Sequence, residues 1–155
     1  MSLTDHASMM SSLCASLTTT SSTKAVKKKD FEVLSEFRYQ LRLFLRFSEE
    51  LLRHKRITPL QYLLLLHIKG YPGRDWATVG ELAQRLQAHH HGVVALVSRC
   101  EKLGWVKRKP SVTDRRRVET HLTAKGERCL EELAQLHRNE LLRSKVFASQ
   151  LKTPK

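Results

Sequence analysis

The apolar residues of this chain recur at three- and four-residue steps over several long stretches, which is the spacing of amphipathic helices. One stretch covers residues 31–54, and the last covers about 124–143. Between them, Thr58 and Pro59 open an apolar segment that ends at Gly70. A capping hydroxyl followed by proline at the first helical position is typical of a helix start. The pattern therefore predicts a mainly helical chain.

Two shorter helices are predicted close together in the middle of the chain. The first begins at Thr78 and Glu81, which have capping-box spacing, and a four-residue turn at 87–90 leads into the second. Gly104 ends the second helix. Its apolar side is predicted to consist of Val93, Val94, Leu96, Val97, Cys100 and Leu103. Two short helices joined this tightly indicate a helix-turn-helix, the supersecondary unit that reads DNA.

Two segments with interleaved β-forming and charged residues follow, at 105–109 and 117–122, and they predict a β-hairpin. The residues between them favour a turn. Six basic residues flank this loop: Lys107, Arg108, Lys109, Arg115, Arg116 and Arg117. The expected fold is therefore mainly α, a winged helix-turn-helix with a two-stranded β wing and long helices at both ends.

The charge of the chain favours a polyanionic partner. Twenty-eight Lys and Arg against fifteen Asp and Glu give a net charge of +13, which suits either nucleic acid or an acidic membrane surface. The longest apolar run, 62–66, is far shorter than the ~20 residues that cross a bilayer, so no membrane span is expected. The three cysteines lack zinc-site spacing, which indicates a reducing, cytoplasmic setting.

Five motifs in this order resemble those of the MarR (multiple antibiotic resistance regulator) family. They are Thr78-Val79-Gly80-Glu81-Leu82-Ala83, Leu96-Val97-Ser98-Arg99, Glu101-Lys102-Leu103-Gly104-Trp105-Val106, Asp114-Arg115-Arg116 and Leu122-Thr123-Ala124-Lys125-Gly126. The resemblance covers about residues 31–142. It implies a homodimer whose first and last helices intertwine, and a ligand-responsive, usually repressing, transcription factor that binds double-stranded DNA.

The resemblance also organises the chain. Residues 1–30 are predicted to be a disordered, basic, Ser/Thr-rich tail, and 146–155 a mobile C-terminal tail. The domain between them, 31–145, would contain dimerisation helices at about 31–54 and 124–145. Its DNA-binding part would span about 58–122.

The leading turn of the second short helix contains His89, His90, His91 and Gly92. Early residues of such a helix reach base edges in the major groove, and its free amide groups favour a phosphate oxygen. We expect these residues to contact DNA; a solvated turn is the second interpretation and a zinc site a distant third.

Three further positions on this helix are assigned to the DNA-binding surface. Ala95 stands where the family often has a basic residue, and Ser98 and Arg99 lie late in the helix. Arg99 could reach a phosphate, or it could pair with Glu101 or Asp114 inside the domain.

The resemblance assigns roles to the wing. Asp114 would buttress the loop through an ion pair, and Arg116 would enter the minor groove, whose negative potential attracts arginine. Lys107, Arg108, Arg115 and Arg117 would hold phosphates. A merely solvated basic face is the alternative.

The terminal helices carry more apolar surface than a lone DNA-reading module would cover. We assign Phe31, Leu34, Leu133, Leu136 and Leu141 to a dimer interface, with a monomer core as the alternative.

Other classes of function fit less well. No nucleophile, glycine-rich phosphate loop or paired carboxylate accompanies the histidines, so the chain is not expected to be an enzyme. Arg38, Arg42 and Arg46 could make the first helix a binder of anionic membranes, although this leaves the wing unexplained, and no membrane partner is expected. A redox- or metal-responsive regulator is a further alternative. No cofactor is expected, but the family implies a small aromatic effector.

Overall fold

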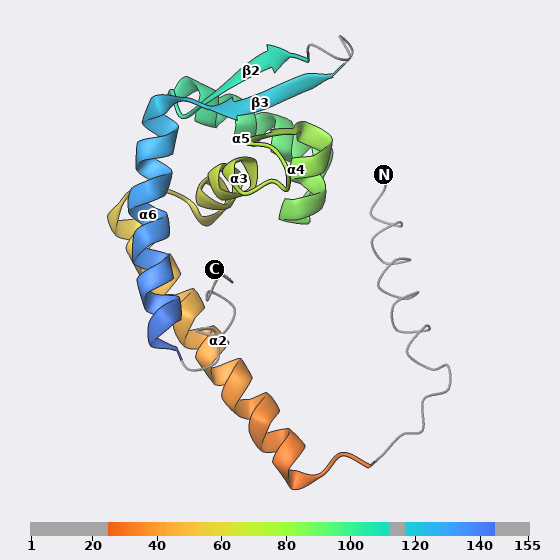
Figure 1. The fold of residues 1–155 in the computed structure, drawn as a ribbon, viewed down its shortest axis with the longest axis vertical. Coiled ribbons are helices and arrows are strands. Elements are labelled where there is room, and N and C mark those ends of the chain that lie inside the picture. Colours follow the sequence, from red (N-terminus) through yellow and green to blue (C-terminus); the bar gives the residue numbers. More distant parts are fainter. Residues whose placement is uncertain (1–24, 112–116, 145–155) are drawn as a thin grey trace. The chain divides into compact units, whose positions relative to one another are not determined.

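The computed structural model describes residues 25–111 and 117–144 of the chain. The chain divides into two units, Met1–Ser35 and Glu36–Lys155. The elements, in chain order, are α2 (Lys28–His54), α3 (Pro59–Lys69), β1 (Trp76–Thr78), α4 (Val79–Leu86), α5 (His90–Lys102), β2 (Val106–Pro110), β3 (Val118–Leu122) and α6 (Ala124–Arg143) (Figure 1). The mainly helical fold class is confirmed.

The helix starts that the sequence predicted are confirmed where capping chemistry marks them. The Thr58 hydroxyl accepts the Gln61 N–H, and Gln61 Oε1 accepts the Thr58 N–H at 2.9 Å. Thr123 caps α6 by accepting the N–H of Gly126 at 3.1 Å. Each bond satisfies a donor that the first helical turn otherwise leaves without a partner.

Helix α2 begins three residues earlier than predicted. Lys28 is its first residue, so residues 28–30 are helical and do not belong to the predicted tail. Asp30 supplies the local reason, because its Oδ2 accepts the Lys27 N–H at 2.8 Å and a carboxylate in the first turn favours the helix dipole.

The wing belongs to a three-stranded antiparallel sheet of order β1-β3-β2, where the sequence predicted two strands. The additional strand β1 pairs Trp76 with His121, and β2 pairs Val106 with Leu122. Because β1 is joined directly to α4, it ties the hairpin to the start of the helix-turn-helix.

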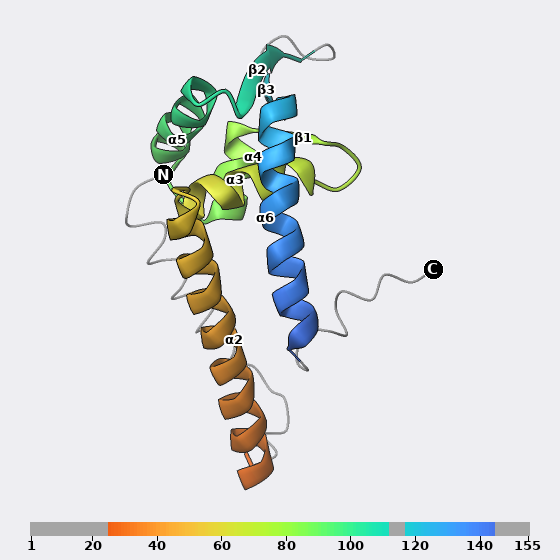
Figure 2. The ribbon, with the colours of Figure 1, turned by 90° about the vertical axis from the view of Figure 1, so that its left-hand side faces the viewer.

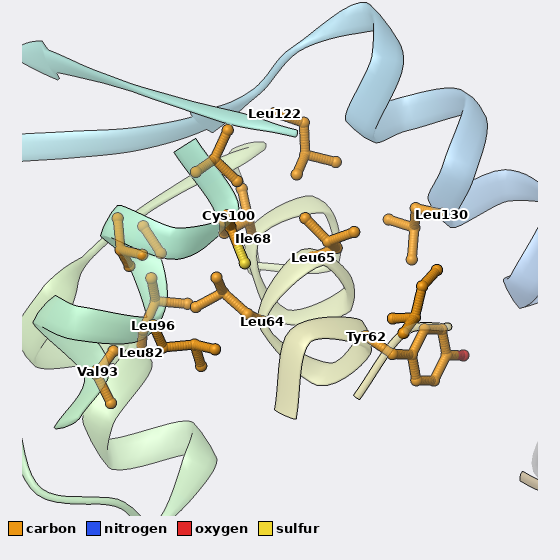
Figure 3. Packing of buried hydrophobic residues seen from close by; sticks show 14 of the residues in the cluster. Tyr62, Leu64, Leu65, Ile68, Leu82, Val93, Leu96, Cys100, Leu122 and Leu130 are labelled. Carbon is orange, nitrogen blue, oxygen red and sulfur yellow. The ribbon is translucent and has the colours of Figure 1, made fainter. Parts of the chain in front are cut away.

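Helix α3 lies at the centre of the core. Its buried residues Leu64, Leu65 and Ile68 are fully enclosed, and they face buried residues of the helices and strands around them (Figure 3). The surrounding members include Leu82, Val93, Leu96, Cys100, Leu122 and Leu130. Because Val93, Leu96 and Cys100 of α5 are buried in this cluster, the opposite side of α5 faces outward.

Helix α6 lies beside the C-terminal half of α2, with contacts at Phe44 and Ser48 and at Lys55 just after the helix (Figures 1 and 2). His137 is buried at this contact; its Nδ1 donates to the Leu133 carbonyl at 2.8 Å, so Nε2 accepts the Ser48 hydroxyl, also at 2.8 Å. The His137 ring stacks on Tyr62 with centroids 4.4 Å apart. This satisfied polar group therefore joins α2, α3 and α6 in one packed junction.

Within residues 25–111 and 117–144, no helix combines the length and the apolar character that a bilayer crossing requires.

Candidate nucleic-acid interface

The turn between α4 and α5 places the leading residues of α5 on the surface. Gln87 adopts a left-handed conformation, with φ of 49°, and its N–H bonds to the carbonyl of Gln84 at 3.3 Å. His89 then occupies the N-cap of α5 with no side-chain capping bond. The His89 side chain therefore accepts no hydrogen bond from the backbone N–H groups in the first turn of α5.

The two sides of α5 differ sharply in exposure. Val93, Leu96, Val97 and Cys100 are buried. The exposed residues include His89, His90, His91, Gly92, Val94, Ala95 and Arg99. The prediction that Val94 and Leu103 belong to the apolar side is wrong, because they are 40% and 42% exposed. The four buried positions already fill the contact with α3 and α4, and Val94 lies about 100° around the helix from Val93.

The three histidines form part of this exposed turn. The rings of His89 and His91 stack with centroids 5.7 Å apart and an interplanar angle of 9°. His90 lines an open groove of about 610 Å³, together with Thr78 and Glu81 of the α4 start and Arg117 before β3. In the described part of the chain, no three His, Cys, Asp or Glu side chains are grouped to hold a metal ion.

Arg108 points from β2 to α5, and this differs from its predicted role at a phosphate. Its Nη1 lies 3.1 Å from Glu101 Oε2, and its Nη2 donates to the Ser98 hydroxyl at 2.6 Å. Nη2 also lies 3.3 Å from the Val94 carbonyl. The Ser98 hydroxyl donates to that same carbonyl at 3.0 Å. Ser98 and Arg108 are therefore hydrogen-bonded to each other within the domain.

Arg99 had two predicted roles, a phosphate contact or an internal ion pair. Glu101, one proposed partner, pairs with Arg108 instead. Arg99 is exposed, and among residues 25–111 and 117–144 it forms no ion pair. Asp114, the other proposed partner, lies outside the described residues.

The base of the wing is held by contacts that the sequence analysis missed. The Ser111 N–H donates to the Arg117 carbonyl at 2.9 Å, which closes the hairpin beneath its tip. Glu119 accepts from Ser111 and from His121, and these bonds lower the pKa of its carboxyl. Lys107 of β2 and Arg117, which directly precedes β3, are both exposed. Arg115 and Arg116, with Asp114, lie in the segment 112–116 outside the described residues.

The similarity to known proteins lies in these same elements. The model of the MarR family matches residues 57–117, which contain the helix-turn-helix and the hairpin up to the start of β3. A MarR family protein from Bacillus stearothermophilus has 27% identity and a TM-score of 0.65, over 77% of this chain and 81% of that one. Over residues 57–117 the chain is similar to the MarR family. Members of this family are DNA-binding transcriptional regulators and not enzymes.

Two further MarR-type structures share the fold at lower identity. AbsC, a MarR family transcriptional regulator from Streptomyces coelicolor, is 20% identical with a TM-score of 0.62, over 85% of this chain and 86% of that one. A mutant of MepR from S. aureus, solved bound to an oligodeoxyribonucleotide, is 21% identical with a TM-score of 0.59, over 79% and 90%. No curated protein matches the chain.

The helix-turn-helix is tied to the sheet by an arginine that the sequence analysis did not single out. The guanidinium of Arg74 lies between two rings, 4.3 Å from the centroid of Tyr71 and 3.8 Å from that of Trp76. It also pairs with Glu81 of the α4 capping box. Arg74 therefore links the loop after α3 to β1 and to α4.

Cys100 and Cys129, the two cysteines of the described residues, lie in surroundings that raise their thiol pKa values. Cys100 is fully buried, and burial raises the pKa of its thiol to about 11. Burial also raises the pKa of Cys129, with the Glu132 carboxylate adding to the effect. A high thiol pKa disfavours the thiolate that oxidants attack. Cys14 lies outside the described residues.

The predicted dimer residues differ in burial. Phe31 and Leu34 of α2 are 58% and 57% exposed, and Leu136 of α6 is 37% exposed. Leu141 is half-buried. Leu133 is only 1% exposed because it packs in the core of its own chain, so its assignment to the interface is wrong.

Proposed function

We propose that this regulator is a homodimeric repressor that binds a pseudo-palindromic operator and responds to a small aromatic effector. The observation that carries the proposal is the exposed side of α5, which bears the histidines, Ala95 and Arg99 while its opposite side is buried. A helix held this way presents one row of side chains to a groove.

The exposed row of α5 supplies three kinds of contact to the major groove. His89, His90 and His91 would donate or accept at base edges and phosphates, with the amide of Gly92 nearby. Ala95, together with the exposed Val94, would contact thymine methyl groups. Arg99 would bind a phosphate.

The wing would hold the neighbouring backbone. Lys107, Arg115 and Arg117 would contact phosphates, and Arg116, buttressed by Asp114, would enter the minor groove. The shared groove of His90 and Arg117 supports this, because it brings the start of α5 and the wing to one surface. Ser98 and Arg108 are left out of the contact set, since they bond to each other.

A second copy would cover the exposed apolar residues of the long helices. Large apolar side chains such as Phe31, Leu34 and Leu136 stay exposed in the single chain, which favours a protein interface. Two-fold symmetry would then place two copies of α5 about 34 Å apart, one turn of DNA.

Selection of bound sequences from a random duplex pool tests the operator. We expect a pseudo-palindrome with half-sites about 10 base pairs apart, and an affinity that falls with salt at a log-log slope of about 0.9 per phosphate neutralised. Arg115/Arg116→Ala should weaken binding to every sequence. A protein indifferent to duplexes at low ionic strength would refute the proposal.

The dimer is tested by sedimentation velocity. Phe31/Leu34→Glu should shift the protein to the monomer mass, because charges in an apolar interface lose hydration without a partner. Leu60→Glu is the matched control, since Leu60 is 48% exposed on α3 and outside the proposed interface. If the parent sediments as a monomer, the dimer proposal is wrong.

The effector is proposed from the family resemblance, for the region between the dimerisation helices and the DNA-binding part. Aromatic rings of Phe44, Phe47 and Tyr62 surround His137 at the junction of α2, α3 and α6, and such rings suit an aromatic ligand. A ligand that favours one conformer would shift the half-site spacing. Titration with phenolic compounds should release operator DNA.

The proposed place of action is the cytoplasm, at the nucleoid.

A further inference from the structure

Arg108 is the one basic residue of β2 that faces α5. Side chains alternate along a strand, and accordingly Lys107 and Lys109 are exposed whereas the Arg108 side chain is only 31% exposed. Its guanidinium reaches three successive groups on one flank of α5: the carbonyl of Val94, the hydroxyl of Ser98 and the carboxylate of Glu101. Arg108 therefore spans nearly two turns of the proposed recognition helix.

Glu101 completes a two-point attachment between the helix and the strand. Its Oε2 lies 3.1 Å from Arg108 Nη1, and its Oε1 accepts the backbone N–H of Arg108 at 3.1 Å. One carboxylate thus holds both the main chain and the side chain of the same residue. Charge-assisted bonds of this kind are stronger than neutral ones and more specific in direction.

We propose that Arg108 is a positioning residue that fixes the wing relative to α5 and binds no phosphate. The inference rests on the proposed function, in which α5 and the wing grip neighbouring parts of one duplex. Its charge is neutralised by Glu101 and its donors are directed at α5, so the residue contributes to DNA binding through geometry.

The two kinds of DNA binding respond differently to such a residue. Non-specific binding depends mainly on the number of phosphates neutralised. Specific binding needs base contacts by the helix and backbone contacts by the wing at the same time. When the wing is no longer held in place, the second contact loses the advantage of being pre-positioned. Loss of Arg108 should therefore lower specificity more than general affinity.

The test compares Arg108→Ala with Lys107→Ala, its exposed neighbour on the same strand. Affinity is measured over a range of salt concentrations for a duplex selected from a random pool and for its scrambled counterpart. Arg108→Ala should weaken the selected duplex by roughly tenfold and the scrambled one by less than about threefold, within the range of coupled contacts. Its salt slope should stay that of the parent, whereas Lys107→Ala should lower the slope by about 0.9.

Glu101→Gln tests the attachment from the helix side. Because the same contact is broken, it should also weaken the selected duplex, and Glu101→Gln/Arg108→Ala should be no weaker than Arg108→Ala alone. Arg108→Lys, which keeps the charge but not the fork of donors, should restore only part of the affinity. If Arg108→Ala fails to fold by circular dichroism, the Glu101→Gln and Arg108→Lys variants carry the test.

Two outcomes would overturn the assignment. A salt slope lowered by about 0.9 in Arg108→Ala would make Arg108 a phosphate contact, and equal losses on both duplexes would remove its role in positioning. Failure of the parent to prefer any duplex would instead refute the proposed function, so the two failures are distinguishable.

Discussion

The backbone of Trp105 occupies the space that a side chain on Gly126 would need. A Cβ built on Gly126 would lie 2.0 Å from the Trp105 carbonyl oxygen and 2.9 Å from its carbonyl carbon. The same carbonyl accepts the Thr123 N–H at 3.0 Å, so the start of α6 is held directly against the entry to the wing. Glycine at position 126 is therefore required by close approach of two backbones.

We predict that Gly126→Ala destabilises the protein by about 3 kcal/mol or more, because the methyl group forces backbone shifts in a packed region. Urea denaturation followed by circular dichroism measures the change. Gly80→Ala is the control, since a Cβ there meets nothing within 4 Å, and it should be neutral or stabilising by up to about 1 kcal/mol. Equal stability of Gly126→Ala and the parent would show that the α6 start and the wing are not in this contact.

The α4 capping box predicts a dependence of stability on pH. Burial raises the pKa of Glu81, but the bonds from Thr78 and the ion pair with Arg74 together outweigh it, so the pKa lies below its ordinary value of 4.5. A carboxyl whose pKa is lower in the folded state stabilises the fold fully above pH 4.5. This contribution is lost as the pH falls through the folded-state pKa.

Glu81→Gln should therefore lower the free energy of unfolding at pH 7 by about 1 kcal/mol, as expected for a damaged cap. The difference from the parent should shrink as the pH falls below 4.5. Thermal denaturation between pH 3 and pH 7 gives the two curves. Glu49→Gln, at an exposed carboxylate of α2, should show no such difference; a gap for Glu81→Gln that is constant with pH would contradict the assignment.

Local chemistry explains which elements the sequence predicts. The starts of α3, α4 and α6 are marked by Thr58, Thr78 and Thr123, whose hydroxyls bond within three residues of their own position. Strand β1 has only three residues, too few for an alternating pattern, and its partner β3 lies more than forty positions later. No nearby residue could therefore indicate it.

The site was predicted less completely because exposure depends on distant packing. Val94 is as apolar as Val93, and only the position of α3 and α4 decides that Val93 is buried and Val94 is not. Likewise, a count of basic residues cannot separate Arg108 from Lys107. Strand alternation and Glu101 together could have done so, since Arg108 has the opposite parity to its two lysine neighbours.

The histidines at the start of α5 give a prediction that separates their three interpretations. Replacing His89, His90 and His91 with Ala should weaken binding to the selected duplex by roughly tenfold or more, as for lost base contacts of about 1–3 kcal/mol each. Dialysis of the parent against EDTA should leave its affinity unchanged. If the Ala variant binds the selected duplex as tightly as the parent, the histidines form a solvated turn. If EDTA abolishes binding and zinc restores it, they form a metal site.

Cys100 should be chemically silent in the folded protein. Its pKa of about 11 leaves only about one thiol in a thousand as thiolate at pH 8, and the buried side chain is closed to reagents. In a Cys14/Cys129→Ser background, where Cys100 is the remaining thiol, Ellman's reagent should not react within hours under native conditions. It should react within minutes in 6 M guanidinium chloride. Treatment with peroxide should leave the DNA affinity of this variant unchanged, and rapid native labelling or a peroxide-induced loss of binding would instead establish Cys100 as an oxidant sensor.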